Sequence, residues 1–117
     1  MTTSTQDVLN HHLQSFGGGD LNEILADYTD ESVIITADGA LRGLAPIRPF
    51  FEAMFAEFAK PGASFAMGAT VVDGDTAFIT WSAETADNVY ELGTDTFVVR
   101  DGKIATQTFA AKTTPKS

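Results

Sequence analysis

Apolar residues near the start of the chain recur with the spacing of one helix face. The residues on this face are Val8, Leu9, His12, Leu13 and Phe16. Ser4 or Thr5 can cap the start of such a helix, because either hydroxyl accepts a hydrogen bond from a free backbone N–H. The glycines at 17–19 end it, because glycine readily adopts the conformation found at helix C-caps. The pattern predicts a first helix between these two signals.

Two further helices are predicted before the middle of the chain. A short one begins after Asp20, a capping residue followed three positions later by Glu23. A longer one follows Gly43, with Pro46 at the first helical position, where its missing N–H would have no partner, and residues 61–62 stop it. The apolar stripe of this helix contains Ile47, Phe50, Phe51, Met54, Phe55 and Phe58. We interpret this stripe as core, with at most one ring reaching a ligand.

The second half of the chain has the pattern of strands separated by tight turns. A β-branched run at 32–36 and its return at 40–42 precede the long helix. Four longer strands are expected after it, at 64–72, 76–85, 89–100 and 103–112. Gly93 indicates a bulge or bend in the third of these, and residues 113–117 form a frayed tail. Consecutive hairpins predict an antiparallel meander.

Helices followed by a long meander predict a single α+β domain over residues 1–117. The strands are apolar on both faces, since Ile79 and Trp81 alternate with Phe78. Such a sheet needs a cover on each side, and the helices supply only one. We therefore expect a homodimer formed through the outer face of the sheet.

Composition excludes several classes of function. The 117 residues include 7 Lys and Arg against 16 Asp and Glu, a net charge of −9, with no cysteine. An acidic chain is a poor partner for nucleic acid or an anionic membrane surface. Without cysteine there is no disulfide, thiolate–zinc site or cysteine nucleophile. The N-terminus lacks the features of a secretory signal and no apolar run approaches the length that spans a bilayer, so a cytoplasmic location is expected.

The order and spacing of three groups of residues resemble a known superfamily. These groups are 19–21 (GDL) with 28–30 (YTD), then 43–51 (GLAPIRPFF), then 95–104 (DTFVVRDGKI). The chain resembles the nuclear transport factor 2-like superfamily, in particular SnoaL-like polyketide cyclases and ketosteroid isomerase-like proteins. The resemblance implies a cone in which a curved antiparallel sheet wraps the long helix, with two further N-terminal helices and an apolar pocket at the open end. It also implies a homodimer.

The superfamily mixes enzymes and binding proteins, so the resemblance leaves two functions open. One is a protein that binds a small hydrophobic, polyketide-like or steroid-like molecule and moves a proton next to its carbonyl. The other is a non-catalytic module that binds a ligand or another protein. Neither needs a cofactor. No metal site is expected either, because the adjacent His11 and His12 cannot both ligate from one helix face.

His12 and Asp95 are the candidate catalytic residues. His12 lies on an apolar helix face, either as a satisfied core residue or as the donor or base that the resemblance places there. Asp95 shares strand parity with Phe97 and Val99, so we expect it to point inward. It is then a structural carboxylate, an acid with a raised pKa that donates a hydrogen bond as in ketosteroid isomerases, or the partner of His12 in a dyad.

The candidate ligand contacts are more dispersed along the chain. The resemblance places the isomerase general base at Thr36, which has no carboxyl, with Asp38 two residues further in a turn. The remaining candidates are Tyr28, Trp81, Gln107 and Phe109. Tyr28 and Trp81 are either core or pocket wall, and the resemblance places Gln107 and Phe109 on the inner face of the last strand. Steroid isomerisation itself is therefore not implied.

Overall fold

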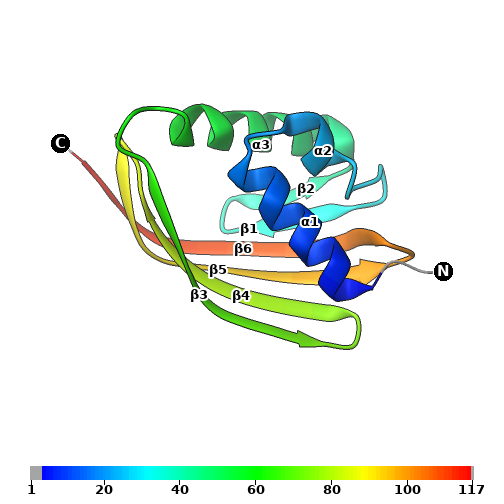
Figure 1. The fold of residues 1–117 in the computed structure, drawn as a ribbon. Coiled ribbons are helices and arrows are strands. Elements are labelled where there is room, and N and C mark those ends of the chain that lie inside the picture. Colours follow the sequence, from blue (N-terminus) through cyan, green and yellow to red (C-terminus); the bar gives the residue numbers. More distant parts are fainter. Residues whose placement is uncertain (1–3, 117) are drawn as a thin grey trace.

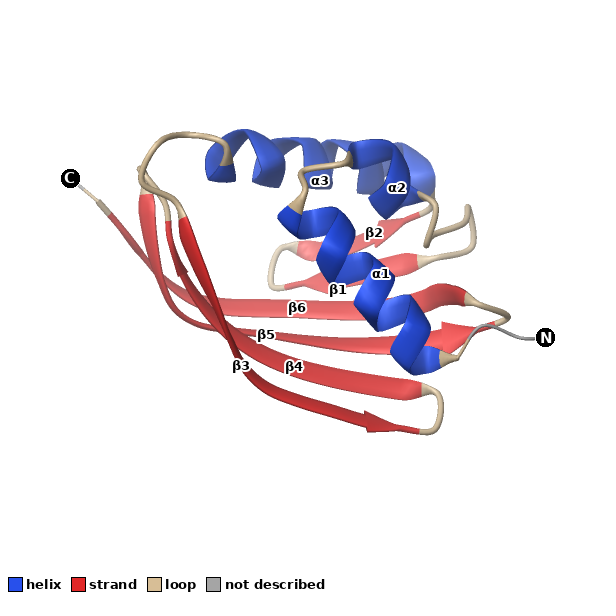
Figure 2. Ribbon diagram, in the orientation of Figure 1, coloured by secondary structure: helices blue, strands red, loops and turns tan. Residues whose placement is uncertain are grey.

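Three helices and six strands make up the computed structural model, which describes residues 4–116 (Figure 2). The helices are α1 (Thr5–Gly17), α2 (Leu21–Leu25) and α3 (Leu44–Phe58). The strands are β1 (Val33–Thr36), β2 (Gly39–Arg42), β3 (Ser64–Asp73), β4 (Thr76–Glu84), β5 (Asn88–Arg100) and β6 (Lys103–Pro115). The expected helices and strands are all present, in the expected order.

Side-chain caps set the starts of the first two helices. Ser4 caps α1 by accepting from the backbone N–H of Asp7, and Asp20 caps α2 by accepting from that of Glu23. The third helix differs from the prediction, because α3 begins at Leu44 and Pro46 is its third residue. A proline is tolerated anywhere in the first turn, where the backbone N–H groups have no partner within the helix.

The strands form one sheet in the order β2-β1-β6-β5-β4-β3. The meander from β3 to β6 is antiparallel, as predicted. The expectation of a wholly antiparallel sheet is corrected, because β1 pairs with β6 in parallel. The frayed tail is also corrected: residues 113–115 continue β6 and pair with β5, because the long hairpin partner extends that far. Ser117 lies outside the described residues.

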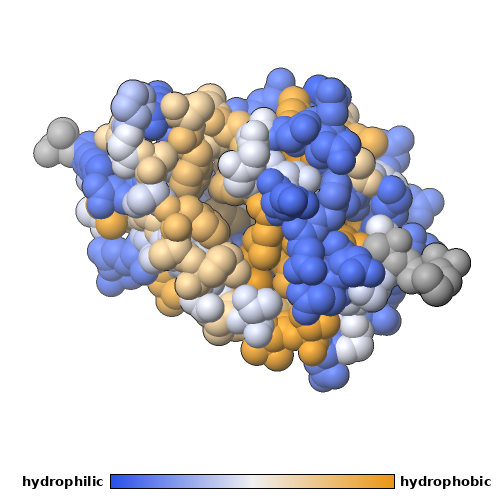
Figure 3. All heavy atoms as spheres, in the orientation of Figure 1, coloured by the Kyte–Doolittle hydropathy of each residue, from blue (hydrophilic) through white to orange (hydrophobic). Residues whose placement is uncertain are grey.

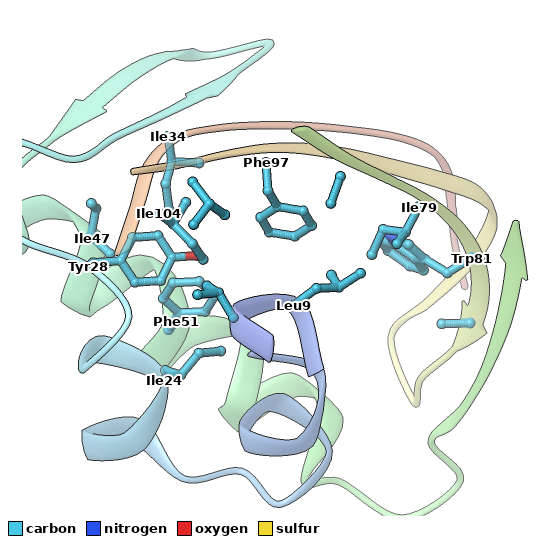
Figure 4. Close-up of a cluster of buried hydrophobic side chains, with 14 residues drawn as sticks. Leu9, Ile24, Tyr28, Ile34, Ile47, Phe51, Ile79, Trp81, Phe97 and Ile104 are labelled. Atoms are coloured by element: carbon cyan, nitrogen blue, oxygen red, sulfur yellow. The ribbon is translucent and has the colours of Figure 1, made fainter. Parts of the chain in front are cut away.

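The sheet curves, and α1 crosses its concave side while α3 lies above the end that carries β1 and β2 (Figure 1). Side chains of β4 alternate between buried and mostly exposed, and those of β5 alternate between buried and half-buried from Gly93 onward. The buried set meets the apolar faces of α1 and α3 in one core. In the close-up, Tyr28 and Trp81 enter this core from opposite ends, with Phe97 between them (Figure 4). The cone-like α+β fold predicted from the sequence is therefore confirmed.

The opposite, convex face of the sheet carries exposed apolar side chains. Cross-strand partners share a face, and one row of partners crosses five strands. The row runs Val71, Phe78, Thr96, Thr108 and Ile35. Val71 is 56%, Phe78 38% and Ile35 45% exposed. Within residues 4–116, no helix is both long enough and apolar enough to cross a bilayer.

Candidate functional site

A small cavity lies between the concave face of the sheet and the two longer helices. Its lining comes from α1, α3 and the four strands of the meander: His12, Leu13, Phe16, Phe50, Phe51, Met54, Phe58, Phe65, Ile79, Trp81, Asp95, Phe97, Gln107 and Phe109. The cavity measures about 40 Å³, which is room for about three waters. A hollow of about 330 Å³ adjoins it, sharing Leu13, Phe16, Phe58 and Phe65. Figure 3 shows a hollow in the surface, with mostly apolar surface around it.

Strand register brings the polar residues of the cavity together. Asp95 on β5 lies opposite Ile79 on β4, and Gln107 on β6 lies opposite Phe97, two residues along from Asp95. Trp81 lies opposite Gly93. A Cβ at position 93 would overlap the indole ring, so the absence of a side chain there lets the ring lie flat against β5. Trp81 and Gln107 therefore approach the Asp95 carboxyl from the two neighbouring strands.

Both oxygens of Asp95 accept hydrogen bonds from uncharged side chains. Trp81 Nε1 donates to Oδ2 at 2.7 Å, and Gln107 Nε2 donates to Oδ1 at 3.0 Å. The residue is only 5% exposed. Burial raises the pKa of the Asp95 carboxyl to about 6, although these two hydrogen bonds act to lower it. Each oxygen keeps one lone pair that neither bond uses.

The hydrogen bonds continue from Gln107 to the first helix. The Tyr28 hydroxyl donates to Oε1 of Gln107. His12 Nδ1 lies 3.5 Å from the same hydroxyl, the long end of the hydrogen-bond range. Burial lowers the pKa of His12 to about 3, with a smaller lowering from the charge of His11. His12 is therefore neutral at pH 7 and a weak base, whereas Asp95 is mostly ionised.

The predicted site residues divide between the cavity and its surroundings. Those that line the cavity are His12, Trp81, Asp95, Gln107 and Phe109. Tyr28 is buried behind the lining and reaches the cavity only through His12 and Gln107. Thr36 is a correction: its hydroxyl bonds within the β1–β2 turn, donating to Gly39 O and accepting from Asp38 N, and it does not line the cavity. The offset arises because β1 ends at this residue.

One further alternative, the His12–Asp95 dyad, is corrected by the geometry. Among the described residues no hydrogen bond joins His12 directly to Asp95, because Gln107 and Tyr28 lie between them, so the dyad is not formed. The stripe of α3 contributes three rings to the cavity lining, Phe50, Phe51 and Phe58, and how many of them reach a ligand stays a prediction.

Neighbouring histidines have opposite environments. His11 faces away from the cavity, where Nδ1 lies 2.8 Å from Asp27 and Nε2 lies 3.1 Å from Glu23. These two carboxylates raise the pKa of His11. Its role is therefore to join α1 to the α2 segment, not to contact a ligand.

The arrangement can hold a small polar group against an aromatic wall. The open lone pairs of Asp95 can accept a hydrogen bond or a proton, and Gln107 Nε2 has a second hydrogen to donate. A carboxyl with a pKa of about 6 is well matched to proton transfer near neutral pH. The surrounding aromatic rings make the site less polar than water, which strengthens both interactions.

Solved structures share this architecture at low sequence identity. A putative ketosteroid isomerase from Kribbella flavida is 17% identical with a TM-score of 0.76, and the match covers 96% of this chain and 82% of that one. The epoxide hydrolase/cyclase-like enzyme SalBIII, which has a role in pyran ring formation in the polyether salinomycin, is 16% identical with a TM-score of 0.78, over 92% and 90%. A putative polyketide cyclase from Sinorhizobium meliloti is 17% identical with a TM-score of 0.73, over 92% and 100%. At these identities the likeness shows the fold alone.

Sequence comparison gives a more direct result. No curated protein sequence matches the chain. The family model of the SnoaL-like domain matches residues 9–107, a span that begins in α1, ends in β6 and contains both His12 and Asp95. The superfamily suggested by the sequence is confirmed, and the chain belongs to the SnoaL-like domain family.

Proposed function

We propose that this protein binds a small, largely hydrophobic carbonyl compound and moves a proton next to the carbonyl, with Asp95 as the general base. The observation that carries the proposal is the Asp95 carboxyl, buried in an aromatic cavity with two uncharged donors and a pKa of about 6. A base of this pKa is ionised at pH 7 yet still strong enough to accept a proton from carbon.

The neighbouring groups support the same reaction. Trp81 and Gln107 hold the carboxylate from both sides, which fixes its open lone pairs toward the cavity. The second hydrogen of Gln107 Nε2 is suited to donate to a carbonyl oxygen. The cavity itself takes only the reacting group, so the apolar remainder of the ligand lies in the adjoining hollow among Phe16, Phe58 and Phe65.

The proposal can be tested without knowing the natural substrate. Acetone, hydroxyacetone and cyclopentanone exchange the hydrogens next to their carbonyl for deuterium in D₂O, which proton NMR follows. We expect the protein to accelerate exchange of at least one probe. Asp95→Asn should reduce the acceleration by about 10²-fold or more, the usual contribution of a general base.

A matched control separates chemistry from folding. Asp38 is an exposed acid in the β1–β2 turn, so Asp38→Asn makes the same substitution away from the cavity and should leave exchange unchanged. Thermal unfolding of both variants checks that the fold survives. Full activity in Asp95→Asn, or no acceleration of any probe by the unaltered protein, would show that Asp95 is not a general base.

A second candidate is a non-catalytic module, which the small volume of the cavity favours. In that case Asp95 and Gln107 only orient a bound group.

Under either function we propose that the protein is a homodimer joined through the convex face, where the row from Val71 to Ile35 leaves apolar side chains uncovered. Val71 and Phe78 are neighbours at one end of this row and Ile35 lies at the other, with two threonines between, and exposed apolar side chains gathered on an uncovered sheet face are typical of an interface.

A further inference from the structure

The hydrogen bonds between Asp95 and His12 form a chain whose direction is determined at one end. Donor and acceptor capacities differ among its members: a carboxylate only accepts, an amide does both, and a hydroxyl has a single hydrogen to give. Each group can therefore be assigned in turn, starting from Asp95. The members in order are Asp95, Gln107, Tyr28 and His12.

Ionised Asp95 can only accept, so Gln107 must present its NH₂ group to Oδ1. The amide oxygen of Gln107 then faces Tyr28, whose only hydroxyl hydrogen is given to that oxygen. The Tyr28 oxygen can now only accept from His12. His12 Nδ1, which faces it at 3.5 Å, must therefore carry the ring hydrogen.

A neutral imidazole has one hydrogen, so Nε2 of His12 is left with a lone pair. Among residues 4–116, Nε2 has no hydrogen-bond partner, whereas every side-chain nitrogen or oxygen that is sealed from solvent has one. Nε2 is therefore not sealed, and the space it can reach is the cavity that His12 lines. Since burial keeps the ring uncharged at neutral pH, this acceptor is a permanent feature of the site.

We propose that Asp95 fixes the tautomer of His12 through Gln107 and Tyr28, so that His12 offers a hydrogen-bond acceptor to the cavity and selects ligands that carry a hydroxyl or enol group. This inference rests on the proposed function and narrows its substrate class to carbonyl compounds with such a group. His12 is then a specificity-determining residue, and Tyr28 is a positioning residue that acts through it. A ligand with only a carbonyl would leave Nε2 buried and unpaired, which is unfavourable.

Substitution of Asp95 gives a sharp test of this series of hydrogen bonds. In Asp95→Asn the side chain has one acceptor and one donor end, and the Trp81 N–H can only donate, so the new amide oxygen must stay with Trp81. The new NH₂ group then faces Gln107, and every later bond reverses. His12 is expected to change tautomer, with its hydrogen moved from Nδ1 to Nε2, although the substitution is three hydrogen bonds away.

The readout is the ring nitrogen spectrum of ¹⁵N-histidine-labelled protein at pH 7.5. There are two histidines, and His11→Asn identifies the signals of His12. We expect hydrogen on Nδ1 in the unaltered protein and on Nε2 in Asp95→Asn. Tyr28→Phe removes the hydroxyl and so breaks the series of hydrogen bonds. The tautomer of His12 should therefore be the same in Tyr28→Phe and in the double variant Tyr28→Phe/Asp95→Asn. Hydrogen on Nε2 in the unaltered protein overturns the proposal, even if no variant folds.

An unchanged tautomer in folded Asp95→Asn would also overturn the proposal, as would a tautomer switch that persists in the double variant without the Tyr28 hydroxyl.

Phenol and anisole test the ligand class, since they differ in the hydroxyl hydrogen. The unaltered protein should bind phenol about 3-fold to 10-fold more tightly, the value of one net hydrogen bond, and phenol should shift the Nε2 signal. Equal binding with no shift contradicts the selection. Neither readout needs turnover, so failure of the proposed catalysis and failure of this inference are distinguishable.

Discussion

Asp95 illustrates how far a single residue's environment follows from its place in a strand. Its parity with Phe97 and Val99 predicted an inward side chain, and all three residues are buried. The value of about 6 could not be predicted, because burial, which raises the pKa, and the hydrogen bonds from Trp81 and Gln107, which lower it, are set only once the strands are in register. Sequence alternation gives the face of a residue, and register gives its partners.

Trp81 is expected to set the working pH of Asp95. Its N–H stabilises the ionised carboxylate, so removing that bond in Trp81→Phe should raise the pKa of Asp95. The rate of hydrogen exchange catalysed by the unaltered protein should rise with pH and level off above about pH 6. In Trp81→Phe the midpoint should move upward by about one pH unit, the value of a single charge-assisted bond. The pH profile with hydroxyacetone measures it.

The control for this prediction is another aromatic residue beside the same ring. Tyr90 packs against Trp81 but donates its hydroxyl to Glu57. Tyr90→Phe therefore perturbs the same cluster without removing a donor to Asp95, and the midpoint should stay near pH 6. A midpoint that is unchanged or lowered in Trp81→Phe would contradict the assigned role of the indole N–H.

The helices and strands were predicted more completely than the pairing of the strands in the sheet. Helical periodicity, caps and glycine stops located α1, α2 and α3, and turn residues separated the strands. The parallel pairing of β1 with β6 joins residues about 70 positions apart, as in Val33 with Thr106, and no local signal specifies it. The placement of Thr36 also depended on more than its own strand, because β1 ends there and the β1–β2 turn holds its hydroxyl away from the cavity.

His11 is predicted to make the attachment of α1 to the α2 segment sensitive to pH. Asp27 and Glu23 raise its pKa above the ordinary 6.5, while burial raises the pKa of Asp27, which also interacts with Lys103. A raised pKa means that the folded state binds the proton more tightly than the unfolded state does. The contribution of His11 is therefore complete below about pH 6.5 and is lost as the pH rises through the folded value.

Above about pH 7.5 His11 can be separated from the other shifted groups of the site. His12 has a pKa of about 3 in the folded state and about 6.5 in the unfolded state, so it is largely neutral in both states only above about pH 7.5, where Asp95, with a pKa of about 6, is ionised in both. Denaturant unfolding between pH 7.5 and 9 should show stability falling in the unaltered protein and a flatter profile in His11→Asn. His12→Asn, which leaves the contacts of His11 in place, should retain the slope. Equal slopes in the unaltered protein and His11→Asn would contradict the prediction.

At the scale of the whole molecule, the two faces of the sheet differ in what covers them. The concave face buries Ile79, Phe97 and the polar chain against α1 and α3, so its cover lies within the chain. The sequence showed that both faces were apolar and that the helices could cover one. It could not show how the second face is covered, because that depends on a surface outside the chain. The convex row is therefore the place where association can be tested.

Phe78 lies near one end of that row and is the most informative position to change. If two convex faces pack together, Phe78→Glu places a charge in a desolvated interface and should weaken association by about 10²-fold or more. Because Phe78 is 38% exposed within one chain, the fold of the subunit should survive. Ala53→Glu adds the same charge at an exposed position of α3 and is the matched control. Sedimentation velocity at micromolar concentration should give a dimer for the unaltered protein and for Ala53→Glu, and a monomer for Phe78→Glu. A monomer in all three cases would show that the convex face is free in solution.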